Sequence, residues 1–119
     1  MKNCNQILKL LSVLVVVVAF TSCKKEYVPA VVGTISYEAD MQPFFDSKCI
    51  KCHNGSSIPL NLQAPDSYNN LNTGGYIDVA TPTNSKLYQK LSGGSMEVNS
   101  TSSLTAMTLL WIEQGALNN

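Results

Sequence analysis

Two cysteines and a histidine stand together in one short stretch, which reads Cys49-Ile50-Lys51-Cys52-His53. Thiols three positions apart lie on one face of a helical turn, where both can meet the vinyl groups of a porphyrin and form thioethers. The histidine that follows directly can offer a ring nitrogen to the porphyrin iron. This C-x-x-C-H spacing is the attachment signature of a c-type haem, so we expect Cys49, Cys52 and His53 to bind one covalent haem c.

The amino-terminal segment predicts export. Residues 1–9 carry two lysines and no acid, and residues 10–20 are almost wholly apolar, with a run of valines. These are the n-region and h-region of a secretory signal. The apolar run is shorter than the roughly 18 residues that span a bilayer, so we do not expect a permanent transmembrane helix.

The end of this apolar run resembles a bacterial lipoprotein box. Small residues, Thr and Ser, stand directly before Cys23, although leucine is usual where Phe20 stands. We therefore expect residues 1–22 to be a signal peptide, Cys23 to be lipidated and residues 23–33 to form a tether. A lipoprotein cysteine carries more than one acyl chain, which is enough for stable anchoring. The alternative is an ordinary cleaved signal that leaves Cys23 as a free thiol.

Two other uses of the C-x-x-C-H residues remain open. An oxidising compartment permits a structural or redox-active disulfide, but the thioredoxin type of C-x-x-C expects a βαβ setting, and the chain has no parallel-strand runs. A structural zinc ion needs four ligands. If Cys4 leaves with the signal peptide and Cys23 takes lipid, Cys49 and Cys52 with the single histidine would need a carboxylate to complete the shell.

Length and composition allow one small domain, which we place at residues 34–119. A domain of this size buries a limited core, and a flat apolar cofactor would extend it. The chain has 8 acidic and 8 basic residues, and all of the basic residues are lysine. With no arginine and no basic stripe, the sequence does not predict a nucleic-acid partner.

Capping residues and apolar periodicity predict an all-α domain. Ser36 can cap a helix that runs into the haem motif, and Pro43 suits the first position of a helix that starts near Gln42. Further helices are expected from Asp66 to Leu71, from a cap at Thr83 or Asn84 to Leu91, and from residues 101–103 to a C-terminal cap at Gly115. In the last helix an apolar stripe is formed by Leu104, Met107, Leu110 and Trp111.

With these residues the chain resembles the small single-haem cytochrome c domains of bacterial lipoproteins, over residues 35–116. Residues 35–45 are similar to that family's amino-terminal helix, residues 84–88 to its helix after a proline-rich loop, and residues 111–116 to its closing helix. The resemblance implies a cytochrome c-like fold of three to five short helices around a covalently bound haem, with the first and last helices crossing at one edge of the haem. The tether and box resemble those of Bacteroidetes lipoproteins.

The resemblance implies a methionine as the second axial ligand. Iron held by methionine and histidine has a raised potential, because thioether sulfur favours ferrous iron. Met41 is on the helix of the haem cysteines, about 12 Å along its axis from the motif, and Met107 falls in the apolar stripe. Met96 follows a Ser-Gly-Gly-Ser loop, where the family carries its distal methionine, although Glu97 stands in place of the usual proline. We expect Met96 to bind iron; the alternative is a solvent-facing methionine beside an open iron site.

Pro59 follows the haem motif by a few residues. In such proteins backbone carbonyls of this region can accept the second ring N–H of the ligand histidine, which would fix the orientation of the ring. The alternative is a loop proline without such a role.

These expectations describe a membrane-anchored single-haem c-type cytochrome that carries electrons in the cell envelope. Its partners would be redox proteins of the envelope, and its location the outer membrane, facing the periplasm or the surface. The sequence has no catalytic triad, paired-carboxylate site or phosphate loop, so we do not expect an enzyme. The alternative function is a haem-based small-gas sensor or binder with an open sixth position; a thiol or metal site without haem would leave the protein colourless.

Overall fold

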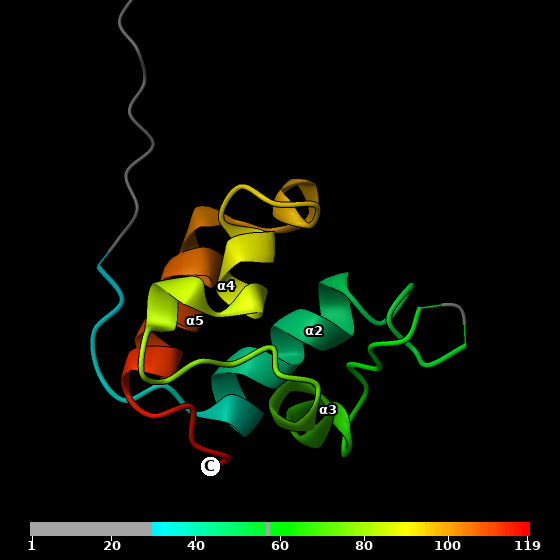
Figure 1. The fold of residues 1–119 in the computed structure, drawn as a ribbon, viewed down its shortest axis with the longest axis horizontal. Helices are drawn as coiled ribbons and strands as arrows, with labels where there is room; N and C mark the ends of the chain where they lie inside the picture. The colour runs from blue at the N-terminus through cyan, green and yellow to red at the C-terminus, as the bar shows by residue number, and fades with distance from the viewer. Residues whose placement is uncertain (1–29, 57) are drawn as a thin grey trace, which may run out of the picture.

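The computed structural model describes residues 30–56 and 58–119 (Figure 1). No strand occurs in these two ranges, so the all-α prediction is confirmed for them. The predicted signal peptide, the lipidated Cys23 and most of the tether lie outside the described residues. The described elements are η1 (Tyr37–Met41), α2 (Gln42–Lys48), α3 (Ser67–Thr73), η2 (Pro82–Asn84), α4 (Lys86–Leu91), η3 (Glu97–Asn99) and α5 (Ser102–Glu113).

The first helical segment starts where its caps predict. Ser36 has extended backbone, its hydroxyl accepts the N–H of Ala39 at 3.1 Å, and its own N–H donates to the Asp40 carboxylate at 2.8 Å. These reciprocal bonds satisfy donors that a helix start otherwise leaves free. The segment begins as the π-helical turn η1 and continues as α2, with Pro43 in the first turn of α2.

The start of α4 differs from the prediction. Thr83 and Asn84 lie inside the 3-10 turn η2, which begins at Pro82, and Ser85 is the N-cap of α4. Because proline is preorganised for the first position of a helical turn, a separate turn begins at Pro82, before the start of α4. Thr83 and Asn84 therefore lack the extended backbone that a cap requires. The Ser85 hydroxyl accepts the N–H of Asp78 at 2.8 Å.

The closing helix α5 has both predicted ends. The Thr101 hydroxyl accepts the N–H of Leu104 at 3.1 Å. At the other end Gly115 has a φ of +97°, and the N–H groups of Gly115 and Ala116 donate to the carbonyls of Ile112 and Trp111 at 3.0 and 2.9 Å. This is the Schellman pattern, which favours glycine because it needs a left-handed backbone.

The core lies where η1 and α5 meet. The ring centroids of Tyr37 and Trp111 are 5.3 Å apart, and Tyr68 from α3 stands edge-on to Tyr37 at 5.1 Å. Trp111 is fully buried, and its indole N–H donates to the carbonyl of Leu117 at 2.9 Å. The other buried apolar side chains of the described residues are Ile35, Met41, Phe45, Leu62, Leu71, Leu87, Leu91, Leu104, Met107, Ile112 and Ala116.

The segment that enters the domain is fixed against the end of α5. The Gln114 side chain accepts the N–H of Ile35 at 2.8 Å and donates to the carbonyl of Gly33 at 2.7 Å. The carbonyl of Asn119 accepts the Ser36 hydroxyl at 2.6 Å. In Figure 1 this entry lies on one side of the domain, and the end of α2 points to the other side.

Candidate functional site

The cysteines and the histidine of the motif lie on a turn that follows α2. The N–H of Cys49 donates to the carbonyl of Phe45 at 2.8 Å, which continues the helical pattern for one more residue. The N–H groups of Cys52 and His53 then both donate to the carbonyl of Cys49, at 3.1 and 2.8 Å. This tight turn brings all three reactive side chains to the wall of one cavity.

The cavity has a volume of about 340 Å³ and a largely apolar wall. Concave apolar sites with a few polar groups are the usual places for cofactors and small ligands. The wall is formed by Phe45, Ile58, Pro59, Leu60, Leu62, Leu87 and Leu91, and the remaining lining residues are Lys48, Cys49, Cys52, His53, Tyr76, Lys90, Ser95, Met96 and Asn99. Ile50 and Lys51, the two middle residues of the motif, do not line it.

The imidazole of His53 is oriented by the backbone. Its Nδ1 is 3.0 Å from the carbonyl oxygen of Leu60, the residue after Pro59. A carbonyl can only accept, so Nδ1 carries the proton and donates it. In the neutral ring Nε2 then has a free lone pair, which is the form that binds a metal.

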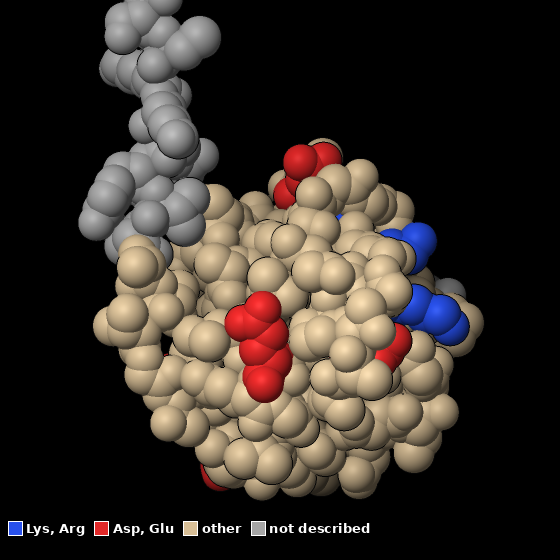
Figure 2. Space-filling model, turned by 60° about the vertical axis from the view of Figure 1, so that its left-hand side comes forward, with Lys and Arg blue, Asp and Glu red and all other residues tan. Residues whose placement is uncertain are grey.

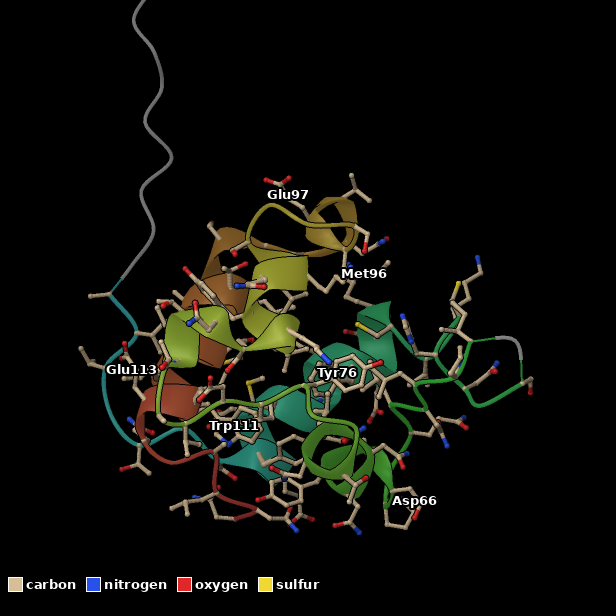
Figure 3. The ribbon with its side chains drawn as sticks, viewed as in Figure 1. Asp66, Tyr76, Met96, Glu97, Trp111 and Glu113 are labelled. Carbon is tan, nitrogen blue, oxygen red and sulfur yellow. The ribbon has the colours of Figure 1, made fainter. Side chains whose placement is uncertain are left out.

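Met96 lines the same cavity as His53. Its backbone N–H donates to the carbonyl of Lys90 at 3.0 Å, which folds the segment after α4 back onto that helix. The other two methionines of the described part lie in the core: Met41 and Met107 are 0% and 8% exposed, and neither lines the cavity. Figure 3 shows Met96 above the end of α2, on the same side of the domain as Tyr76.

Two glycines allow the segment before Met96 to fold this way. Gly93 has a φ of +149°, a conformation that L side chains rarely adopt. A Cβ on Gly94 would lie 2.6 Å from the carbonyl oxygen of Gln89, so only glycine fits there. The placement of Met96 thus depends on this Gly-Gly pair.

The two thiols differ in exposure. Cys49 is half-buried and Cys52 is exposed, and both are free. Burial raises the pKa of the Cys49 thiol above its ordinary value, because an apolar surrounding disfavours the thiolate. Within residues 30–56 and 58–119, no group of three or more His, Cys, Asp or Glu side chains is arranged to hold a metal ion.

Two lysines line the cavity, and none of its lining residues is acidic. Lys48 and Lys90 line it, Lys51 stands between the two cysteines, and the ammonium of Lys86 lies 5.9 Å from the ring centre of Tyr76, which also lines it. These are all the lysines of the described residues. Figure 2 shows the lysines gathered at one edge of the face in view, while acidic groups are scattered across that face.

Tyr76 is a cavity residue that the sequence did not reveal. It follows α3, and its N–H donates to the carbonyl of Leu71 at 3.0 Å. A Cβ on Gly74 would lie 2.7 Å from a carbon of the Tyr76 ring, so glycine is needed for the ring to fold back over the end of α3. The Gly74-Gly75 pair was the only signal, and it indicates a break without indicating which side chain the break positions.

Comparison of the chain with protein-family models, with curated proteins and with solved structures gave no match. No helix of the described part is long and apolar enough to cross a membrane. What the described residues define is an all-α domain whose apolar cavity is bordered by two thiols, one imidazole and one thioether.

Proposed function

We propose that this protein is a c-type cytochrome with one covalently bound haem, and that it carries electrons in the cell envelope. One observation carries the proposal: Met96, which is distant in the sequence from the motif, borders the same apolar cavity as Cys49, Cys52 and His53. The motif predicts the first three as haem-binding residues without any reference to the cavity. When bound, haem supplies a one-electron ferric–ferrous couple.

Each of the four residues has a distinct role in this proposal. Cys49 and Cys52 hold the cofactor as thioethers, from positions fixed by the turn after α2. His53 offers Nε2 to the iron, and the bond from Nδ1 to Leu60 keeps its ring in one orientation. Met96 offers its thioether sulfur; methionine and histidine together favour ferrous iron and raise the potential.

The apolar wall suits a cofactor that transfers electrons. An apolar shell around a bound cofactor limits its contact with water and helps to set its redox potential. Phe45, Leu62, Leu87 and Leu91 belong both to this wall and to the core. The wall is therefore held by packing, which limits the rearrangement that accompanies a change of charge at the iron.

Anchoring through Cys23 is a separate part of the proposal, because that residue lies outside the described part of the chain. The lipoprotein box predicts a lipid on Cys23 and a location in the cell envelope, with the outer membrane as the expected membrane. Redox proteins of the envelope would be the partners. Replacing Cys23 with Ser should release the domain from membranes after a salt wash.

Covalent haem is tested by expressing the full chain in a host with cytochrome c maturation machinery. The denatured protein should keep its colour, and its mass should exceed that of the processed chain by one haem. Cys49→Ser and Cys52→Ser should each remove a thioether. Cys23→Ser is the matched control, since it removes a cysteine outside the cavity and should leave the haem attached. Colour that extracts fully into acid-acetone, or a colourless protein, would contradict the proposal.

A further inference from the structure

Gln42 is a buried polar side chain at the start of α2 that the haem motif does not explain. It is 7% exposed, and all of its amide atoms are engaged. Nε2 donates to the carbonyl of Leu62 at 3.0 Å and to the carboxylate of Asp46 at 2.7 Å, and Oε1 accepts the hydroxyl of Ser67. A buried amide is costly unless its bonds are made, so these partners fix the position of the side chain.

One branch of this network reaches the candidate iron ligand. The carbonyl of Leu62 is held by Gln42, and the N–H of Leu62 donates to the carbonyl of His53 at 2.8 Å. Two residues earlier, the carbonyl of Leu60 accepts the Nδ1–H of His53 at 3.0 Å. The segment around Leu62 is therefore attached to His53 at two points and to α2 through Gln42.

The other branch leads away from the cavity. The Ser67 hydroxyl, which bonds Gln42, also accepts the hydroxyl of Tyr37 at 2.9 Å. Ser67 is 1% exposed and belongs to α3, and Tyr37 is 3% exposed and belongs to η1. Neither residue lines the cavity. A substitution at Gln42 breaks both branches, whereas a substitution at Ser67 breaks only the branch to Tyr37. Comparing the two separates an effect on His53 from a general loss of stability.

We propose that Gln42 is a positioning residue for His53: it holds Leu62 so that the carbonyl of Leu60 stays within hydrogen-bond distance of Nδ1. The inference rests on the proposed function, since it concerns the residue proposed to bind iron. A hydrogen bond from Nδ1 raises the basicity of the ligating imidazole. A more basic ligand stabilises ferric iron, so Gln42 acts to lower the reduction potential through a chain of hydrogen bonds, without touching the cofactor.

The test compares two variants of the haem-loaded full chain. Gln42→Leu removes the amide and so the bond to Leu62, whereas Ser67→Ala leaves that bond in place and breaks the branch to Tyr37. Both variants lose buried hydrogen bonds and should unfold more easily than the wild type. Only Gln42→Leu should favour ferrous haem, by about threefold, which is roughly 30 mV for a one-electron couple.

Hydrogen exchange provides a readout that does not depend on electron transfer. The amide of Leu62 should exchange about tenfold faster in Gln42→Leu than in the wild type, and at a nearly unchanged rate in Ser67→Ala. If Gln42→Leu does not accumulate, Gln42→Asn replaces it. That variant keeps an amide but is one methylene shorter, so it cannot reach Leu62 and should show the same rise in potential.

The outcomes separate this inference from the proposed function. A wild-type protein without covalent haem would overturn the proposed function, and this inference with it. Covalent haem in every variant, with equal potentials in the wild type and in Gln42→Leu or Gln42→Asn, would overturn this inference alone. An equal rise in potential in Ser67→Ala would also overturn it, because the effect would then follow from lost packing and not from the bond to Leu62.

Discussion

The protein has two apolar regions that share a wall but are built differently. Around Trp111 the aromatic rings of η1, α3 and α5 pack against one another and close the space between them. At the end of α2, side chains of the same apolar type line an open cavity of about 340 Å³. In Figure 3 Trp111 lies below and to the left of Tyr76 and Met96, which line the cavity.

The two regions also differ in their polar and sulfur-containing groups. In the core, the indole N–H of Trp111 and the hydroxyl of Tyr37 each bond a partner within the protein, at 2.9 Å in both cases. The cavity is instead lined by Cys49, Cys52, His53 and Met96, which we propose bind haem. Core changes should therefore alter stability, and cavity changes should alter cofactor binding.

The largest expected effect is in the cavity. His53→Ala removes the imidazole that we propose as an iron ligand, and we expect complete loss of the low-spin absorption spectrum of the wild type. Ile50→Val is the matched control, because Ile50 lies within the motif but does not line the cavity, and it should keep the spectrum. An unchanged spectrum in His53→Ala would show that another group binds the iron.

Two methionines sharpen the same contrast. Met96→Ala should abolish the weak near-infrared charge-transfer band of methionine-bound ferric haem, lower the potential and let carbon monoxide bind quickly, because a donor that favours ferrous iron has been removed. Met107→Leu conserves volume in the core and should keep the band at a cost under about 1.5 kcal/mol.

The reverse result, with the band lost only in Met107→Leu, would show that Met107 and not Met96 binds the iron. A wild-type protein that already binds carbon monoxide quickly would favour the small-gas sensor over the electron carrier. Absorption spectra in both oxidation states are sufficient to decide between these outcomes.

The next effect concerns the core. Trp111 is 0% exposed and packs on two tyrosines, so Trp111→Ala should lower the free energy of unfolding by about 3–5 kcal/mol. Leu110→Ala on the same helix, where Leu110 is only partly buried, should cost clearly less. Denaturant titration of the haem-loaded protein measures both. A loss below about 1 kcal/mol for Trp111→Ala would contradict the closed core.

The smallest effect is a pH dependence of the core. Burial raises the pKa of Tyr37 to about 12, because the charged phenolate is disfavoured in the apolar interior. The unfolded chain loses this proton near the ordinary pKa of 10.0 and the folded chain does not, so the contribution is fully present below pH 10 and is lost as pH rises towards 12. The loss amounts to about 2–3 kcal/mol.

Denaturation at several pH values between 9 and about 12 checks this sign. Tyr37→Phe removes the titrating group, so its stability should fall less steeply than that of the wild type over the same range. Parallel curves for the two proteins would show that the Tyr37 hydroxyl is not protected by burial.

Local signals in the sequence were sufficient for much of the fold. The caps at Ser36, Thr101 and Gly115 depend only on residues a few positions away in the sequence. The structure confirms their predicted roles at helix ends. The start of α4 was predicted wrongly, because Pro82 begins a separate turn and displaces the cap to Ser85. The all-α class is confirmed for the described residues, while the haem and the cytochrome c-like arrangement remain predictions.

The site was predictable in its chemistry and less so in its surroundings. The C-x-x-C-H motif names three residues through their spacing alone. The bonds from Gln42 to Leu62 and Ser67 join residues 20 and 25 positions apart, and no periodic pattern records such pairs. The Tyr76 ring reaches the cavity because Gly74 has no Cβ to collide with it. This close contact cannot be predicted from the sequence.

The bonds between the entering segment and Gln114 have a mechanical consequence. If Cys23 is attached to a lipid, any pull on the domain enters through residues 30–35 and is first resisted by the contacts of Gln114 with Gly33 and Ile35. The motif-bearing end of α2 lies on the other side of the domain (Figure 1). Drag from a moving membrane would thus load the contacts with the end of α5 before it reaches η1 and α2.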